Sequence, residues 1–346
     1  MIYSVDAYPG RSVSVNGKSY LYFGGTSYLG LQTDEAFKEL FVKNLKRYGT
    51  NYGASRKANV QISIFDEVEA YLSILTTSQS CTTLSSGYLA GQLVAQTLNT
   101  NDHELFYAPE SHAALQIAPK QPYANYNDLE QAVRAHLKRN KSIPVVFIDS
   151  IDVLGSGYPD FTAIRRLPLE DVILVVDDSH GIGVVGNKGA GSYTRAKQLN
   201  ARELIVCCSL GKGFGIQAGA ILGTKKRIQQ FTNTDFFGGA SPASPAALAT
   251  LVQGETIFDE KRILLQSNVR LFLDSLKNPK RLHYLDTYPA FYFSDSQIAS
   301  FLEKNNVLIT NFNYPNTASP LMNRIVISAA HEKEDILYLA ELLNLH

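Results

Sequence analysis

The sequence predicts an α/β protein with a large domain on a mostly parallel central sheet, followed by a smaller α+β domain. Three short runs rich in valine and isoleucine, residues 143–149, 172–178 and 204–209, lack polar alternation, as strands buried on both faces do. Their ends lie about 30 residues apart, the length of a strand, a crossover helix and a return strand. From residue 255 onward a long helix precedes short strands that alternate with helices, which is an α+β pattern.

Three helices are expected before these strands. The first is capped by Thr33, carries Asp34 and Glu35 in its first turn and ends before Gly49. Its apolar stripe consists of Phe37, Leu40, Phe41 and Leu45. The second helix is expected at residues 64–75 and the third after Gly87.

The second part of the chain is expected to contain a helix over residues 255–276, strands over 290–294 and 324–328, and helices over 297–304 and 334–345. The resulting division is an N-terminal segment of residues 1–45, a large domain of residues 46–250 and a small C-terminal domain of residues 251–346.

Composition restricts the class of protein. Lysine plus arginine equals aspartate plus glutamate at 32 each, so no charge excess favours nucleic acid or a membrane surface. The longest apolar runs are far shorter than the roughly 20 residues of a membrane span, and residues 1–10 lack the features of a signal peptide. Three cysteines, two of them adjacent, build neither a disulfide framework nor a CxxC metal site. We expect a cytoplasmic protein with no membrane span and no nucleic-acid partner.

Polar residues follow each of the predicted buried strands. In parallel sheets, ligands bind beyond the carboxyl ends of the strands. We therefore expect Asp149, Asp177, His180, Ser209 and Lys212 to converge at one rim of the sheet.

Lys212 stands in a glycine-rich turn, Ser-Leu-Gly-Lys-Gly-Phe-Gly, directly after a predicted strand. Partial burial there favours an amine nucleophile or Schiff-base former, whereas a solvated loop lysine is the plain alternative. A phosphate-binding P-loop is excluded, because its pattern requires a glycine at Val206 and a hydroxyl residue at Gly213.

Asp177 and His180 lie in the run Asp-Asp-Ser-His after the second buried strand. A carboxylate at this position pairs with a buried cation or a protonated ring nitrogen. A capped loop and a metal pair are the alternatives, but no second cluster has ligand spacing, so we predict no metal site.

Three further segments of the sequence contain candidate residues. Ser86, Gly87 and Tyr88 open a helix, where free amides and hydroxyls hold phosphates, although serine caps are common. His112 follows a predicted strand and is either catalytic or a hydrogen-bonding residue. Arg324 begins a strand of the small domain, where a guanidinium clasps a carboxylate or simply lines a strand edge.

Together these candidates require a ligand with a phosphate, a basic ring nitrogen and a carbonyl for the lysine. Pyridoxal 5'-phosphate (PLP) has all three groups.

The motifs also follow one another in a specific order over almost the whole chain. The segments are Tyr28-Leu-Gly-Leu31, Gly53-Ala-Ser-Arg56, Ser86-Gly-Tyr88, Ser111-His-Ala113, Val176-Asp-Asp-Ser-His-Gly181, Ser209-Leu-Gly-Lys212 and Arg324-Ile-Val-Ile-Ser-Ala-Ala-His331. In this order and spacing the sequence resembles the α-oxoamine synthases. This family of fold-type I PLP enzymes, with an aspartate aminotransferase-like fold, includes aminooxononanoate synthase, aminoketobutyrate CoA ligase and serine palmitoyltransferase.

The resemblance implies roles for the residues near the cofactor ring. Lys212 would form the covalent link to the cofactor and Asp177 would hold its pyridinium nitrogen. His112 would stack on the ring, and His180 would hydrogen-bond its phenolic oxygen.

The resemblance also implies roles at the phosphate and at the substrate. Ser86, Gly87, Tyr88 and Ser209 would contact the phosphate. Arg324 would clasp the amino-acid carboxylate. The family's site lies at a homodimer interface, and Ser241 aligns where the partner chain contributes a phosphate ligand.

The implied activity is condensation of glycine, alanine or serine with an acyl thioester, either acyl-CoA or acyl carrier protein. Carbon dioxide is lost and an α-aminoketone is released. An aminotransferase on the same scaffold is the alternative, because fold alone does not fix the reaction. A catalytically silent subunit is a third possibility, and the presence of Lys212 argues against it.

The sequence departs from the family pattern at three positions and in the segment after Asp149, which reads Ile151-Asp-Val-Leu-Gly155 instead of the usual serine-containing pattern. Thr26 replaces an asparagine before the Tyr-Leu-Gly segment, and Val60 and Phe65 replace a glycine and a histidine after Arg56.

Overall fold

The computed structural model describes residues 2–152, 157–314, 317 and 319–346. These form two compact units. One consists of residues 1–39 and 254–346, and the other of residues 40–253. The helix α1 (Glu35–Tyr48) begins in the first unit and ends in the second.

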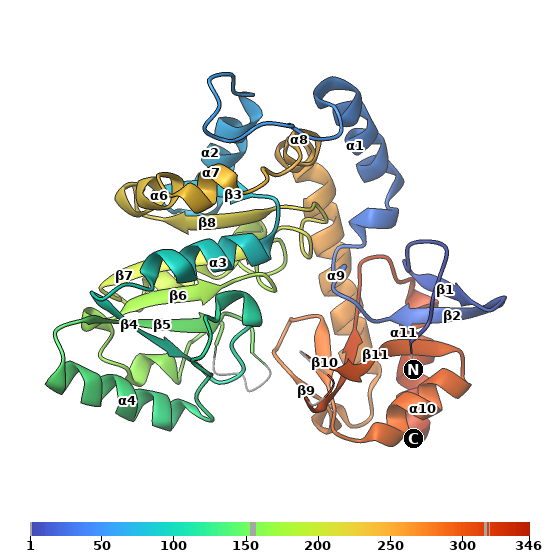
Figure 1. The fold of residues 1–346 in the computed structure, drawn as a ribbon. Helices are drawn as coiled ribbons and strands as arrows, with labels where there is room; N and C mark the ends of the chain where they lie inside the picture. The colour runs from blue at the N-terminus through green and yellow to red at the C-terminus, as the bar shows by residue number, and fades with distance from the viewer. Residues whose placement is uncertain (1, 153–156, 315–316, 318) are drawn as a thin grey trace. The chain divides into compact units, whose positions relative to one another are not determined.

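The unit of residues 40–253 is built on a six-stranded sheet with the order β3-β8-β7-β6-β5-β4 (Figure 1). Its strands are β3 (Ser80–Leu84), β4 (His103–Tyr107), β5 (Ile143–Asp149), β6 (Ile173–Asp177), β7 (Glu203–Ser209) and β8 (Gly219–Gly223). Strands β4 to β7 are parallel, whereas β8 runs antiparallel to both β7 and β3. The predicted mostly parallel sheet is confirmed.

The helices of this unit are α2 (Ile64–Thr76), α3 (Gly87–Leu98), α4 (Tyr126–Arg139), α5 (Tyr193–Lys197), α6 (Lys225–Thr232), α7 (Asp235–Gly239) and α8 (Pro245–Gln253). Helix α3 packs on the central strands, and its buried face joins theirs in one core. This core includes Leu93 and Val94 of the helix and Val175 and Ile205 of the sheet. The strands whose sequences lack polar alternation are thus buried on both faces, as their composition predicts.

The other unit contains a sheet with the order β1-β2-β11-β12-β10-β9. Its strands are β1 (Ser12–Val15), β2 (Lys18–Phe23), β9 (His283–Tyr284), β10 (Ala290–Tyr292), β11 (Val307–Asn313) and β12 (Leu321–Val326). Its further helices are α9 (Glu255–Ser275), α10 (Ser296–Lys304) and α11 (Lys333–Leu345). The N-terminal hairpin joins the C-terminal strands because β2 pairs in parallel with β11.

Two local expectations are wrong. The cap of α1 is Asp34, whose Oδ1 accepts a hydrogen bond from Phe37 N at 2.9 Å, whereas Thr33 closes the preceding 3-10 turn. No crossover α-helix joins β5 to β6 in the described part of that connection, which contains two single 3-10 turns at 164–166 and 169–171. Phe161 and Ile164 of this connection are fully buried.

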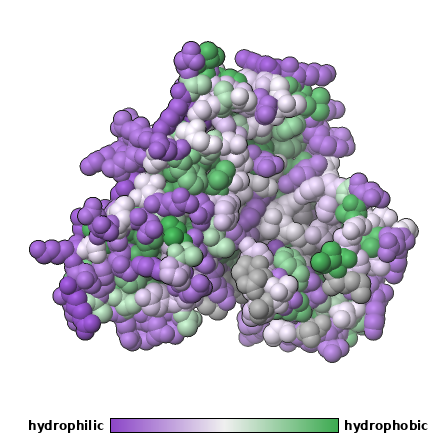
Figure 2. All heavy atoms as spheres, in the orientation of Figure 1, coloured by the Kyte–Doolittle hydropathy of each residue, from purple (hydrophilic) through white to green (hydrophobic). Residues whose placement is uncertain are grey.

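One face of the molecule is largely polar. On the face shown in Figure 2, hydrophilic residues predominate and hydrophobic residues form small scattered patches. Among the described residues, no helix combines the length and apolar character needed to cross a bilayer.

Strand β8 approaches the start of α3 so closely that a side chain at Gly219 is excluded. A Cβ atom there would lie 2.1 Å from Ser86 O and 2.7 Å from Gly87 N. We expect Gly219→Ala to lower the free energy of unfolding by about 1–3 kcal/mol, as overpacking does. Urea denaturation checks this. The control is Gly239→Ala, where nothing lies within 4 Å, and equal destabilisation of both variants would contradict the prediction.

Candidate active site

The ends of β5, β6 and β7 form the rim at which the predicted site residues meet. Asp149 and Asp177 are register partners at the ends of β5 and β6, and Asp177 is in turn the partner of Cys207 in β7. Neighbouring residues in register project on the same side of a sheet. The carboxyl groups of Asp149 and Asp177 therefore lie on one side of the rim.

Lys212 and His180 are in direct contact at this rim. Lys212 Nζ lies 2.9 Å from His180 Nε2. The lysine follows β7 and the histidine follows β6, so the contact joins two loops that the parallel strands bring side by side. Both side chains are partly exposed and within reach of a ligand.

His112 lies in the segment after β4 and is joined to the same rim. Its backbone N–H donates to Asp149 Oδ1 at 3.2 Å, and its ring Nδ1 accepts from Ala114 N at 3.1 Å. Burial lowers the pKa of the ring, and the Lys212 charge adds to this effect while Asp177 opposes it. The Nδ1 acceptor role and the lowered pKa indicate a neutral imidazole with its proton on Nε2.

Asp177 is a buried carboxylate, with 8% of its surface exposed. Its Oδ1 accepts a hydrogen bond from Ser179 N at 2.9 Å. No Lys, Arg or His in the described part of the chain forms an ion pair with it. A buried carboxylate without an ion-pair partner is costly unless a ligand supplies the cation or a donor.

The start of α3 lies against the end of β7. Ser86 caps the helix by accepting from Leu89 N at 3.2 Å, as its sequence predicts. A Cβ atom at Gly87 would lie 2.6 Å from Ser209 Cβ, so the helix start and the strand end touch. The predicted phosphate-contact residues Ser86, Gly87 and Ser209 are thus neighbours, while the Tyr88 side chain is exposed.

Ser241 lies beside the same helix start within this chain. Its carbonyl oxygen accepts a hydrogen bond from Ser85 N at 3.2 Å, and the residue is exposed.

Arg324 belongs to the other unit, in β12. Its register partners are Tyr292 in β10 and Thr310 in β11. Its Nη2 donates to Gly25 O at 3.2 Å, while its Nε is buried and has no hydrogen-bond partner. Neighbouring tyrosine hydroxyls keep the pKa of the guanidinium above its usual value despite the opposing effect of burial.

Sequence reasoning gave no role to Asp178, which organises the rim. Its Oδ1 accepts from Ser150 Oγ at 2.6 Å and its Oδ2 from Ser192 N at 2.8 Å. Burial raises its pKa from 3.8 to about 6, and these hydrogen bonds partly offset the rise. The only sequence signal was its place next to Asp177, because its partners are distant in the chain.

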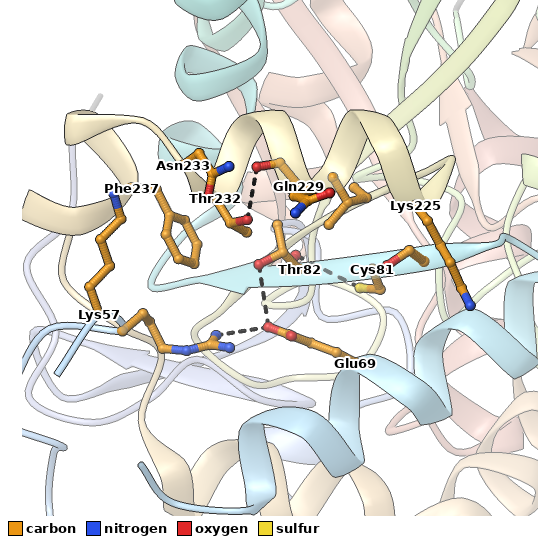
Figure 3. Close-up of a pocket in the computed structure, with 12 residues that line it drawn as sticks. Lys57, Glu69, Cys81, Thr82, Lys225, Gln229, Thr232, Asn233 and Phe237 are labelled. Atoms are coloured by element: carbon orange, nitrogen blue, oxygen red, sulfur yellow. Dashed lines mark hydrogen bonds and ion pairs between the residues drawn. The ribbon is translucent and has the colours of Figure 1, made fainter. Parts of the chain in front are cut away.

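A polar pocket of about 780 Å³ lies away from the rim, between α2, β3 and α6 (Figure 3). Arg56 Nη1 pairs there with Glu69 Oε1 at 2.7 Å, and Glu69 also accepts from Thr83 N at the free edge of β3. The Arg56 guanidinium lies 4.2 Å from the ring centroid of Phe65. Arg56 of the sequence motif thus contacts Phe65, one of the departures, and forms a partly buried ion pair with Glu69 at a strand edge.

The described residues contain no group of three or more His, Cys, Asp or Glu side chains arranged to hold a metal ion. The three cysteines are buried free thiols, and burial raises the pKa of each.

Comparison with known proteins identifies the family of this chain. The model of the aminotransferase class I and II family matches residues 82–343. The chain therefore belongs to that family.

Two relatives show which named enzymes the chain is similar to. The chain is 28% identical over 350 residues to 8-amino-7-oxononanoate synthase of Aliivibrio fischeri, covering 95% of this chain and 90% of the relative. It is 25% identical over 362 residues to the enzyme of that name from Petrotoga mobilis, covering 97% of this chain and 90% of the relative.

Solved structures share the fold. Serine palmitoyltransferase from S. paucimobilis, solved with PLP and myriocin bound, has a TM-score of 0.81 at 20% identity and covers 99% of this chain and 91% of that one. The 8-amino-7-oxononanoate synthase of Francisella tularensis has a TM-score of 0.70 at 17% identity and covers 94% and 97%. These names are those of α-oxoamine synthases, which confirms the resemblance drawn from the motifs and the predicted fold class.

The raised pKa of Asp178 predicts a pH-dependent stability. Because its folded pKa of about 6 exceeds the 3.8 of the unfolded chain, its contribution is full below pH 3.8 and lost as the pH rises through about 6. We expect the stability of the wild type relative to Asp178→Asn to fall by about 2.4 kcal/mol between pH 4 and pH 8. Denaturant unfolding at several pH values measures this. A difference independent of pH would contradict it.

Proposed function

We propose that this protein is a PLP-dependent acyltransferase of the α-oxoamine synthase type. It condenses a small amino acid, glycine, alanine or serine, with an acyl thioester. A bond forms between the amino-acid Cα and the thioester carbonyl carbon, and the thiol and carbon dioxide leave, so that the product is an α-aminoketone. The observation that carries the proposal is the contact of Lys212 with His180 on the rim that holds Asp177.

The chemistry of the rim residues fits PLP. PLP has an aldehyde, a ring nitrogen, a ring face and a phosphate. The rim offers an amine for the aldehyde, a buried carboxylate with no ion-pair partner for the ring nitrogen, two imidazoles for the ring and a helix start for the phosphate. Gly87 lies so close to Ser209 that no side chain fits there, so the helix start presents backbone groups to a ligand. The relatives and the structural neighbours support the same cofactor, since one neighbour was solved with PLP bound.

Each rim residue has a place in this proposal. Lys212 binds the cofactor aldehyde and Asp177 holds the ring nitrogen. His112 stacks on the ring and His180 donates to its phenolic oxygen. The phosphate is held by Ser86, Gly87 and Tyr88 at the start of α3 and by Ser209 at the end of β7, with the partner subunit's Ser241 as a further ligand.

Bound in this way, PLP supplies an electron sink that stabilises negative charge at the amino-acid Cα. Lys212 supplies the base, because its amine takes the Cα proton when that amine is not bonded to the cofactor. His180 Nε2, 2.9 Å from Lys212 Nζ, orients that amine. Asp177, as a carboxylate, keeps a proton on the ring nitrogen that it binds.

Arg324 binds the substrate carboxylate in this proposal. Its buried Nε has no hydrogen-bond partner, and none of the described carboxylates forms an ion pair with it. A guanidinium with an unused donor suits a planar carboxylate, because two parallel hydrogen bonds satisfy both groups.

The proposed enzyme acts in the cytoplasm as a homodimer with shared active sites. Ser241 of each chain would then serve the phosphate site of its partner. The support is the resemblance to the α-oxoamine synthases, in which the site lies at a subunit interface.

Aminotransfer is the alternative activity, since the family is named after it. Product analysis separates the two. We expect PLP-loaded protein to release carboxyl-labelled carbon dioxide from glycine, alanine or serine only when an acyl thioester is present. The control is a keto-acid acceptor without thioester. Amino-group transfer to that acceptor with no carbon dioxide release would overturn the acyltransferase proposal and support the aminotransferase.

A further inference from the structure

Asp149 is a rim residue to which neither the motifs nor the proposed function gives a role. It is the last residue of β5 and the register partner of Asp177. Two carboxyl groups on adjacent strand ends repel each other when both are charged, so one of them tends to keep its proton.

A second contact ties Asp149 to the site. Its Oδ1 accepts the backbone N–H of His112 at 3.2 Å. The His112 segment follows β4, at the far side of β5 from Asp177. Asp149 therefore stands between the residue proposed to stack on the cofactor ring and the residue proposed to hold its nitrogen.

The charges around Asp149 come from several elements. Asp177 on β6 and Asp152 in the following loop are negative, and Lys212 is the facing cation. Tyr126 of α4 donates to Asp152 Oδ2 at 3.1 Å. Burial of the carboxyl group and the Asp177 charge raise the pKa of Asp149 well above its usual range, against the smaller opposing effects of the His112 N–H and Lys212.

We propose that Asp149 is a positioning residue: as the neutral member of a carboxyl pair it places no second charge beside Asp177, and it holds the His112 segment at the rim. This rests on the proposed function for the roles of Asp177 and His112. The positioning act itself needs only an acceptor oxygen at Asp149, because the hydrogen bond runs from a backbone N–H. An uncharged amide at this position meets the same need.

Three variants test the two halves of the proposal. Asp149→Asn keeps the acceptor and removes the ionisable group. Asp149→Ala removes both. Asp152→Asn is the matched control, because it removes a neighbouring negative charge, whose Oδ2 accepts from Tyr126 at 3.1 Å, and leaves the Asp149 carboxyl group in place.

The first readout uses the protein without cofactor. Infrared spectra with isotope-labelled aspartate at pH 7.5 are expected to show a protonated carboxyl C=O stretch that disappears in Asp149→Asn and persists in Asp152→Asn. In the same samples, NMR signals of the His112 ring are expected to shift in Asp149→Ala and to stay in place in Asp149→Asn. A carboxyl band unchanged by Asp149→Asn, or His112 signals unchanged by Asp149→Ala, overturns the proposal.

The second readout is the affinity for PLP. Loss of one hydrogen bond that positions a ligand group corresponds to an affinity loss of about fivefold, expected for Asp149→Ala. Asp149→Asn and Asp152→Asn are expected to bind within about twofold of the wild type. A fivefold loss in Asp149→Asn contradicts a neutral Asp149. If the wild type binds no PLP, the proposed function fails, while the infrared and NMR results still decide the state and contact of Asp149.

Discussion

The candidate site depends on the hydrogen-bonded junction of the β5, β6 and β7 ends. Ser150 N donates to Asp177 O, and Asp178 N donates to Cys207 O, both at 2.8 Å. Ser209 N donates to Ser179 Oγ at 2.8 Å. These hydrogen bonds continue the sheet beyond the last paired residues of the strands. The backbone is therefore held in place where the functional side chains branch from the three strand ends. A loop with freer ends would not hold an amine and an imidazole at hydrogen-bond distance.

Electrostatics at this junction set the roles of the side chains. Asp149, Asp177 and Asp178 stand within one rim, and burial makes three charges there costly. The conflict is resolved differently at each position. Asp178 accepts hydrogen bonds from Ser150 and Ser192, Asp149 is shifted toward its neutral form, and Asp177 accepts from Ser179 N.

Much of the fold was predictable because buried parallel strands leave an unambiguous pattern. The run ending at Asp149 matches β5 residue for residue, and Ser86 caps α3 as its sequence indicates. Strand β8 was not predicted, since a five-residue run with glycine at both ends resembles a turn. The crossover between β5 and β6 was expected to be helical from its length alone, and length does not fix conformation.

For the site, the sequence indicated which strand ends carry polar residues, but not how those residues interact. The contact between Lys212 and His180 requires the register of β6 and β7, which the local sequence does not specify. The roles of Asp149 and Asp178 depend on partners such as His112 and Ser192, far away in the chain. Long-range hydrogen bonds of this kind leave no periodic signal.

The central claim is that Lys212 is the amine that takes PLP at this rim. The most direct measurement is borohydride reduction of the PLP-treated wild-type protein, followed by mass-spectrometric mapping of the modified lysine. The account predicts one phosphopyridoxyl group per chain, on Lys212. Modification of another lysine with Lys212 untouched, or stable binding with no modified lysine, would contradict it.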